Sequence, residues 1–220
     1  MVDVSTSILS VKKENIIDTI YKLEEAKTNY FHIDVMDGSF VPNLACGMKM
    51  IHGLKGVADL VFDVHLMVNE PVRFVKRMQE AGADVISVHY EACSNVAETL
   101  KEIKQCGIRA GIVLNPETSA EVLTEEIWKL ADVIQVMTVH PGRDGQHFIE
   151  DTLDKIKDIR RRSTDTGEWK DIEVDGSINC GNIGKVIKAG ANIIVSGKAL
   201  FNGNLAENIA NMKQQAAMDE

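Results

Sequence analysis

Several features that mark other protein classes are missing from this sequence. No apolar run is long enough to span a bilayer, and the N-terminus shows no apolar core of a secretory signal. None of the four cysteines belongs to a C-x-x-C pair, so free thiols in a reducing compartment are expected. The net charge of −9 disfavours nucleic acid, whose phosphates would be repelled. We therefore expect a cytoplasmic protein with no membrane and no nucleic acid as its partner.

The composition is that of a soluble globular protein. Of the 220 residues, 45% are hydrophobic and 26% are charged, and this length is enough for one large domain with a full core. No linker or low-complexity stretch divides the chain. The sequence therefore predicts a single domain over residues 1–220.

Strand and helix patterns alternate eight times along the chain. Strands are expected at residues 3–9, 30–35, 60–67, 85–89, 109–114, 133–139, 172–174 and 192–195. Helices are expected between them, among them 48–54, 120–130 and 149–162, with a long loop at 37–47 and a last helix near 205–214. This order predicts an α/β fold, a (β/α)8 TIM barrel. An open doubly wound sheet is the alternative, but no G-x-G-x-x-G follows the first strand.

Polar side chains interrupt the second expected strand. His32, Asp34 and Met36 are two residues apart, so a strand directs all three to the same side. A buried histidine beside a buried carboxylate is costly unless a charged group needs both. His65 and Asp175 stand at the ends of two other strands, and the carboxyl ends of barrel strands meet at one mouth.

These residues together predict a metal site. Taken singly, each has a simpler interpretation: a histidine satisfied in the core, or an aspartate that forms a turn. Imidazole and carboxylate are, however, the usual ligands of divalent cations, and four such groups at one mouth would be costly without one. We expect His32, Asp34, His65 and Asp175 to bind one divalent ion, with Zn²⁺, Fe²⁺, Mn²⁺ and Co²⁺ all compatible.

Two carboxylates on opposite walls also suggest two-base chemistry. Asp34 and Asp175 would exchange a proton with the two faces of one carbon, and the metal would lower the cost of the enediolate formed between these steps. Met36, Met67 and Met137 would line the cavity and exclude water, although plain core filling is the equal alternative. Glycine turns after the last three strands predict a phosphate site.

Two further polar residues lie near this set. His89 ends the fourth strand and is interpreted as either a neighbour of the site or a core residue, with the core favoured. Asp63 lies on the same side of its strand as His65 and could orient it, or could be a buried turn partner.

Long motifs in this chain resemble those of the ribulose-phosphate 3-epimerase family, over nearly its whole length. They include Ser7-Ile8-Leu9-Ser10, His32 to Gly38, Phe40-Val41-Pro42-Asn43, Asp63 to Met67 and Glu173-Val174-Asp175-Gly176. The resemblance implies a barrel with one divalent metal, a phosphorylated ketose substrate and a homo-oligomer. It makes Asp34 and Asp175 the base and the acid, with the roles exchanged in the reverse direction, and it places Ser7 and His65 in contact with substrate. The implied reaction converts D-ribulose 5-phosphate to D-xylulose 5-phosphate.

The departures from the family pattern concern the phosphate end. The usual Gly-Phe-Gly-Gly turn is Gly142-Arg143-Asp144-Gly145, the usual Gly-Ser after the eighth strand is Gly197-Lys198, and Ser177 follows Gly176 as in relatives that act on a six-carbon ketose phosphate. Two alternatives follow, a ketohexose 6-phosphate (allulose 6-phosphate) 3-epimerase and a non-catalytic barrel that binds sugar phosphates. The expected substrate-binding residues are Ser7, Met36, His65, Met67, Met137, Gly142, Arg143, Asp144, Gly145, Gly176, Ser177, Gly197 and Lys198.

Overall fold

The strands form a closed parallel barrel. The computed structural model describes residues 2–45, 48–54, 56–143 and 145–219. The barrel strands are β1 (Asp3–Ser7), β2 (Tyr30–Asp37), β4 (Val61–Met67), β5 (Val85–His89), β6 (Arg109–Leu114), β7 (Val133–Met137), β8 (Asp171–Asp175) and β9 (Ile193–Ser196). Each pairs in parallel with its neighbours, and β1 pairs with both β9 and β2. This closure confirms the predicted TIM barrel over the open sheet.

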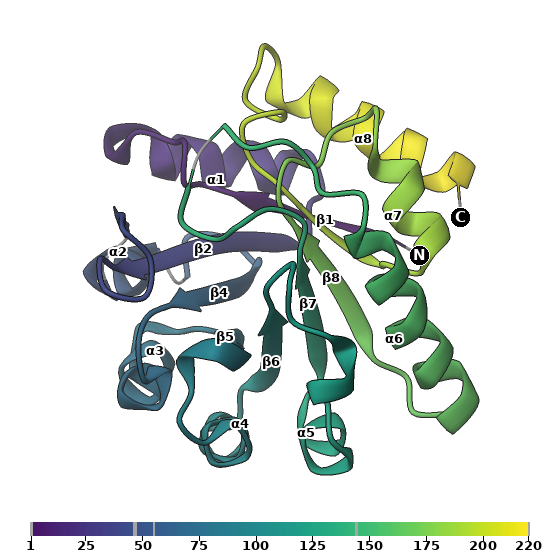
Figure 1. The fold of residues 1–220 in the computed structure, drawn as a ribbon. Helices are drawn as coiled ribbons and strands as arrows, with labels where there is room; N and C mark the ends of the chain where they lie inside the picture. Colours follow the sequence, from purple (N-terminus) through teal and green to yellow (C-terminus); the bar gives the residue numbers. More distant parts are fainter. Residues whose placement is uncertain (1, 46–47, 55, 144, 220) are drawn as a thin grey trace.

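Helices surround the strands as an outer ring (Figure 1). They are α1 (Ile16–Glu25), α2 (Met48–Leu54), α3 (Val75–Ala81), α4 (Val96–Gln105), α5 (Glu125–Leu130), α6 (Thr152–Thr166), α7 (Ile183–Ala189) and α8 (Leu205–Asp219). Short 3₁₀ turns η1 (Lys13–Asn15), η2 (Pro71–Phe74), η3 (Tyr90–Ala92) and η4 (Ala120–Val122) accompany them. Helix α1 shows the pattern, because Ile16, Ile20 and Leu23 recur at helical spacing and are all buried.

The main core lies between the strands and the helices. Along β2, Phe31 and Ile33 point outward into this core, while His32 and Asp34 alternate with them and point into the barrel. Phe31 meets Phe62 of β4 edge to face, with ring centroids 5.4 Å apart. Apolar packing therefore holds the outside of each strand, which leaves the inside free to carry polar groups.

Several expected boundaries differ from the structure by a few residues, and the expected helix at 120–130 is divided into η4 and α5. The segment 37–47 is not all loop, because β3 (Leu44–Ala45) pairs antiparallel with the end of β2; residues 46–47 lie outside the described part. Gly38, with φ of +71°, allows the chain to reverse there. Helix α6 continues past 162 and ends at Thr166, where Gly167 adopts a left-handed φ of 69° and its N–H donates to the Thr164 carbonyl. Residues 163–166 thus form the last turn of α6.

The structure can be compared with two expectations from the sequence, those on membrane spans and on the cysteines. Within the described residues, no helix combines the length and the apolar character needed to cross a bilayer. Cys93, Cys106 and Cys180 are free thiols.

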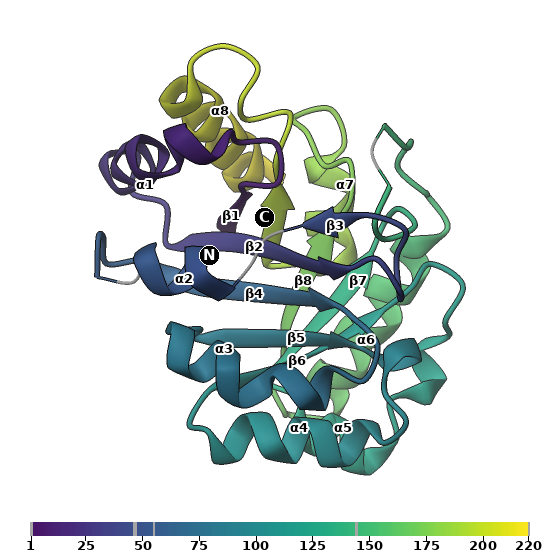
Figure 2. The same ribbon diagram turned by 90° about the vertical axis from the view of Figure 1, so that its left-hand side faces the viewer.

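The parallel strands bring their carboxyl ends to one end of the barrel. In Figure 2 the arrowheads of β2, β4 and β5 point to the same side, and the loop from β2 to β3 lies there. Across this end, the Asn43 side-chain amide donates to the Gly142 carbonyl at 2.9 Å. The loops after β2 and β7 are therefore joined over the mouth.

Candidate metal and active site

Strand register places the four predicted ligands around one point. Asp34 of β2 is paired with His65 of β4, and Ser7 of β1 with His32 of β2. Asp175 is the last residue of β8, beside Met137 of β7. One donor atom from each of His32, Asp34, His65 and Asp175 can be chosen so that all lie within 4.8 Å of one another. The structure thus brings together all four residues.

The donor separations suit a small cation. His32 Nε2 lies 3.5 Å from Asp34 Oδ1 and 3.9 Å from Asp175 Oδ2, and His65 Nδ1 lies 3.2 Å and 3.6 Å from the same two oxygens. Four ligands held tetrahedrally at about 2.1 Å from an ion would be about 3.4 Å apart. The side chains of His32 and His65 are fully buried, while Asp175 is 19% exposed. The histidine side of the cluster is therefore buried inside the barrel, and solvent reaches the cluster at Asp175.

One atom of the cluster has no hydrogen-bond partner. His32 Nδ1 lies 2.7 Å from Asp63 Oδ2, and because a carboxylate only accepts, Nδ1 donates that bond. His32 Nε2 is buried and unpartnered among the described residues, and it faces the oxygens of Asp34 and Asp175. A lone pair that faces carboxylate oxygens needs a cation or a proton between them. Because His32 Nε2 is left free to bind a cation beside these two carboxylates, the residues of the cluster fit a divalent metal ion.

The pKa shifts of the cluster residues also favour a positive charge at this site. Burial lowers the pKa of His32, but the charges of Asp63 and Asp34 outweigh it and raise that pKa well above its usual value. Burial likewise raises the pKa of Asp34, and the contacts with His32 and His65 more than reverse the effect. The Asp34 carboxylate therefore stays charged, and it favours positive charge beside it in the cavity, as a proton or as a metal ion.

Ser7 and the methionines complete the wall of the site. The Ser7 hydroxyl donates to Asp34 Oδ2 at 2.8 Å, so the two oxygens of Asp34 have different partners. Met36 and Met67 are paired across β2 and β4 and pack with Val41. Met137 is buried with Val113 and Val139 on the β6 and β7 side. Apolar sulfur-containing side chains thus flank the cluster from two directions.

Asp63 has a different partner from the one expected. Its carboxylate contacts His32 and not His65, because the register sets Asp63 directly opposite His32. The Ser5 hydroxyl also donates to Asp63 Oδ2, at 3.3 Å. Asp63 therefore orients the imidazole of His32.

Glu173 is a buried acid that the sequence interpretation missed as a site residue. Its Oε1 lies 3.5 Å from His32 Nδ1, and burial together with the charge of Asp63 raises its pKa well above the usual value. It precedes Asp175 by two residues, so the alternation that selected His32 and Asp34 would also have selected Glu173. Gln135 of β7 was missed in the same way, and its Nε2 lies 3.3 Å from His65 Nδ1.

The loops predicted to bind phosphate follow β7, β8 and β9. Gly142, at φ +72°, packs so closely on Val41 that an added Cβ would lie 2.3 Å from the Val41 Cβ. Ser177 adopts a left-handed φ of 55°, and its hydroxyl donates to the Gln146 carbonyl at 2.6 Å. Gly197 passes close to the Ser7 carbonyl. The remaining expected residues are placed as follows: Gly145 and Gly176 lie in these loops at positive φ, Arg143 and Lys198 are exposed, and Asp144 lies outside the described residues.

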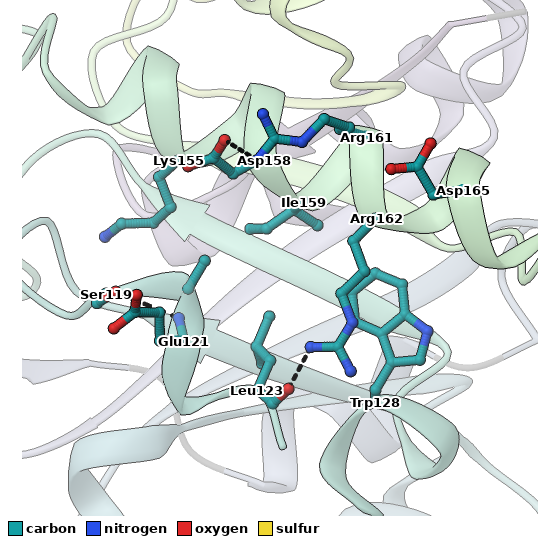
Figure 3. A pocket seen from close by; sticks show the side chains of 11 residues that line it. Ser119, Glu121, Leu123, Trp128, Lys155, Asp158, Ile159, Arg161, Arg162 and Asp165 are labelled. Atoms are coloured by element: carbon teal, nitrogen blue, oxygen red, sulfur yellow. Dashed lines mark hydrogen bonds and ion pairs between the residues drawn. The ribbon is translucent and has the colours of Figure 1, made fainter. Parts of the chain in front are cut away.

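Two hollows differ in their relation to this site. A hollow of about 270 Å³ lies at the mouth, between the loops after β2, β6 and β7, and Arg143 is among its lining residues. Another, of about 530 Å³, lies on the outer wall between η4, α5 and α6, where Trp128, Lys155 and Arg162 line it (Figure 3). Arg162 there stacks on Trp128 and donates to the Leu123 carbonyl, so its charge is already engaged. None of the predicted site residues lines the outer hollow.

The fold and the site define a class, a TIM barrel with a buried histidine–aspartate cluster at the carboxyl ends of its strands. Within that class, the chain belongs to the ribulose-phosphate 3 epimerase family, whose model matches residues 3–201. The family resemblance expected from the motifs is thereby confirmed.

Individual relatives cover most of the chain. Ribulose-phosphate 3-epimerase of Bacillus subtilis is 43% identical over 203 residues, 91% of this chain and 93% of that protein. The chloroplastic ribulose-5-phosphate-3-epimerase of Arabidopsis thaliana is 41% identical over 213 residues, 96% of this chain and 75% of that protein. Among solved structures, 3-keto-L-gulonate-6-phosphate decarboxylase from Vibrio cholerae matches with a TM-score of 0.75 over 100% of both chains. At 12% identity it shows a shared fold alone.

Proposed function

We propose that this protein is a metal-dependent 3-epimerase that interconverts D-ribulose 5-phosphate and D-xylulose 5-phosphate. The observation that carries the proposal is the pair of carboxylates, Asp34 and Asp175, held on different strands around one buried pair of histidines. Membership of the family supports the reaction, because its relatives of known name are ribulose-phosphate 3-epimerases. The enzyme is thus an isomerase that acts on a phosphorylated sugar.

Asp34 and Asp175 carry the proton transfers. One carboxylate takes the proton from C3, and the electrons of the broken C–H bond form a C2–C3 double bond while negative charge moves to the C2 oxygen. The other carboxyl group, protonated, returns a proton to the opposite face of C3, and the electrons move back. The two residues exchange roles in the reverse direction. Ser7 fixes the Asp34 carboxylate through its bond to Oδ2.

His32, Asp34, His65 and Asp175 are the residues that would hold the divalent cation. When bound, such an ion supplies Lewis-acid charge that makes negative charge on a nearby substrate oxygen less costly. Imidazole and carboxylate donors suit Zn²⁺, Fe²⁺, Mn²⁺ and Co²⁺ alike. Asp63, through its bond to His32 Nδ1, keeps the His32 Nε2 lone pair directed at the site.

The remaining predicted residues bind the substrate body and its phosphate. Met36, Met67 and Met137 exclude water beside the reacting carbon without offering a competing proton donor. Backbone amides of the loops after β7, β8 and β9 would bind the phosphate, with Arg143 and Lys198 adding charge-assisted bonds. Because the chain carries a net charge of −9, this local set of donors must provide the attraction for an anion.

The two alternatives are not favoured. Ser177 suggested a six-carbon substrate, but its hydroxyl is bonded to the Gln146 carbonyl, which links the loops after β7 and β8. The relatives that match nearly the whole chain are named for ribulose phosphate. A non-catalytic barrel would have no need for two carboxylates beside a metal-type cluster. The expected homo-oligomer and cytoplasmic location stay predictions.

The proposed reaction is tested with Asp34→Asn and Asp175→Asn in deuterated water, with metal content measured in parallel. The epimerisation rate of each variant should fall by at least about a thousandfold, since the reaction needs one group to remove the proton from C3 and another to return it. Each should retain deuterium exchange at C3 for one epimer only, because one base remains.

Asp165→Asn on α6 is the matched control, since Asp165 is exposed and lies in the last turn of α6, at the end of the helix away from the mouth. It should keep wild-type rates with both sugars. Near-wild-type epimerisation in either site variant would contradict the assignment of the two acids. Faster turnover of a ketohexose 6-phosphate than of the pentulose phosphate would contradict the substrate.

A further inference from the structure

His89 at the end of β5 lies directly behind one of the candidate metal ligands. Its Nε2 is 2.8 Å from Nε2 of His65, and both side chains are fully buried. The His65 and His89 rings are stacked, with centroids 4.9 Å apart, and the Phe40 ring also packs on His89, with its centroid at 4.8 Å. His89 is therefore held in place and is not a loosely packed core residue.

The short contact between the two imidazoles restricts their protons. Two nitrogens at this distance form a hydrogen bond only if one carries a hydrogen and the other a lone pair. His65 faces Asp34 and Asp175 with Nδ1, so it can bind a metal there only when its hydrogen is on Nε2. His65 must then donate to His89, and His89 must accept.

Glu91 lies beside the other ring nitrogen of His89. Glu91 Oε2 lies 3.4 Å from His89 Nδ1, near enough for its charge to favour a hydrogen there although the two are not aligned as a hydrogen bond. The Glu91 carboxylate is fixed from the loop after β6, since it accepts from the Asn115 amide at 3.0 Å and from the Thr118 hydroxyl. With its hydrogen on Nδ1, His89 presents a lone pair to His65.

We propose that His89 and Glu91 are positioning residues that hold His65 in the tautomer able to bind the metal. The inference rests on the metal site of the proposed function and deepens it. The opposite tautomer of His89 would donate to His65 Nε2 and force the His65 hydrogen onto Nδ1, between the imidazole and the metal. The Glu91 carboxylate, which acts through His89, would thus control whether His65 Nδ1 is available as a metal ligand.

The test compares two replacements of His89 in the whole protein. Glutamine can place an acceptor near the position of Nε2, whereas leucine fills the space without one. We expect His89→Leu to bind Co²⁺ ten- to a hundredfold more weakly than the wild type, and His89→Gln to stay within about fivefold. Affinity is measured by competition with a chelator, and the visible absorption of bound Co²⁺ reports the ligand set. Equal affinity in all three proteins would overturn the proposal.

Nitrogen NMR of the zinc-loaded wild type tests the tautomers without any variant. The expected pattern is a hydrogen on Nε2 of His65 and on Nδ1 of His89; a hydrogen on Nε2 of His89 would refute the proposal even if His89→Leu failed to fold. Glu91→Gln should weaken Co²⁺ binding, because an amide can donate to His89 Nδ1. Glu117→Gln, which makes the same substitution at an exposed carboxylate paired with His140, is the matched control and should leave Co²⁺ binding unchanged.

These readouts separate the proposal from the proposed function. Metal affinity and tautomers are measured without substrate. A wild type that binds metal with the expected tautomers yet turns over no ketose phosphate would contradict the function alone. Normal turnover with unchanged affinity in His89→Leu would contradict the positioning role alone.

Discussion

Replacing Asp63 with asparagine would remove the charge that orients His32 while keeping the shape of the side chain. The carboxylate accepts from His32 Nδ1 at 2.7 Å, and both side chains are fully buried. Asparagine can place either its oxygen or its amide nitrogen there. In the second orientation His32 carries its hydrogen on Nε2, the nitrogen that faces Asp34 and Asp175. The ligand would then be blocked.

The expected loss is in metal affinity and not in stability. Removing a group that orients a ligand typically costs ten- to a hundredfold in metal binding, or about 1.4–2.7 kcal/mol. Stability should be unchanged or higher, because Asp63 Oδ1 and Glu173 Oε1 are buried without hydrogen-bond partners among the described residues. An amide beside Glu173 could donate to its Oε1, and the charge of Asp63, which raises the pKa of Glu173, is gone.

The assay is chelator competition for Co²⁺, paired with urea unfolding of the metal-free proteins. Ser5→Ala is the matched control, since it removes a hydroxyl bonded to the same carboxylate but leaves the charge and the contact with His32. It should bind Co²⁺ within about threefold of the wild type. An Asp63→Asn protein with wild-type affinity would refute the orienting role of Asp63, and a large loss of stability would refute the account of its buried charge.

Two further predictions concern stability. Gly111→Ala should destabilise the barrel by about 1–3 kcal/mol in urea unfolding, because its Cβ would lie 2.1 Å from the Ser87 hydroxyl, and a second change, Ser87→Gly, should restore part of the loss. For Asp171, burial raises the pKa, but hydrogen bonds from Asn192 and Arg109 and the charge of Arg109 outweigh it and lower the pKa. Because the pKa of Asp171 is lower in the folded state, the ionised carboxylate stabilises the protein at any pH above the unfolded-state pKa of about 3.9. This stabilisation is lost as the pH falls through the folded-state pKa. The stability advantage of the wild type over Asp171→Asn should therefore shrink below about pH 4. An advantage that is the same at pH 7 and pH 2.5 would contradict this account.

The sequence was sufficient to predict the barrel and the four-residue cluster, for a physical reason. Strands such as β2 need apolar side chains on the outside, so a polar residue at every second position must face inward. Barrel closure then brings inward residues from β2, β4 and β8 to one mouth. His32, Asp34, His65 and Asp175 follow from these two rules alone.

The contacts that depend on how neighbouring strands pair could not be predicted from the sequence. The partner of Asp63 depends on the register of β2 against β4, which sets it opposite His32, whereas sequence spacing connects it only to His65. The contact of His89 with His65 depends likewise on the orientation of two rings. The short strand β3 was missed because its pairing with β2 depends on a single turn at Gly38.

Titration of the metal-free protein with Zn²⁺ or Co²⁺ tests the central claim most directly, with bound metal and epimerisation followed in the same samples. We predict that the chain binds about one ion and that the rate with D-ribulose 5-phosphate rises in proportion to occupancy. His65→Leu, which removes one ligand of the cluster, should show neither saturation at the same metal concentration nor recovery of rate. Full epimerase activity in protein stripped of metal would contradict the account.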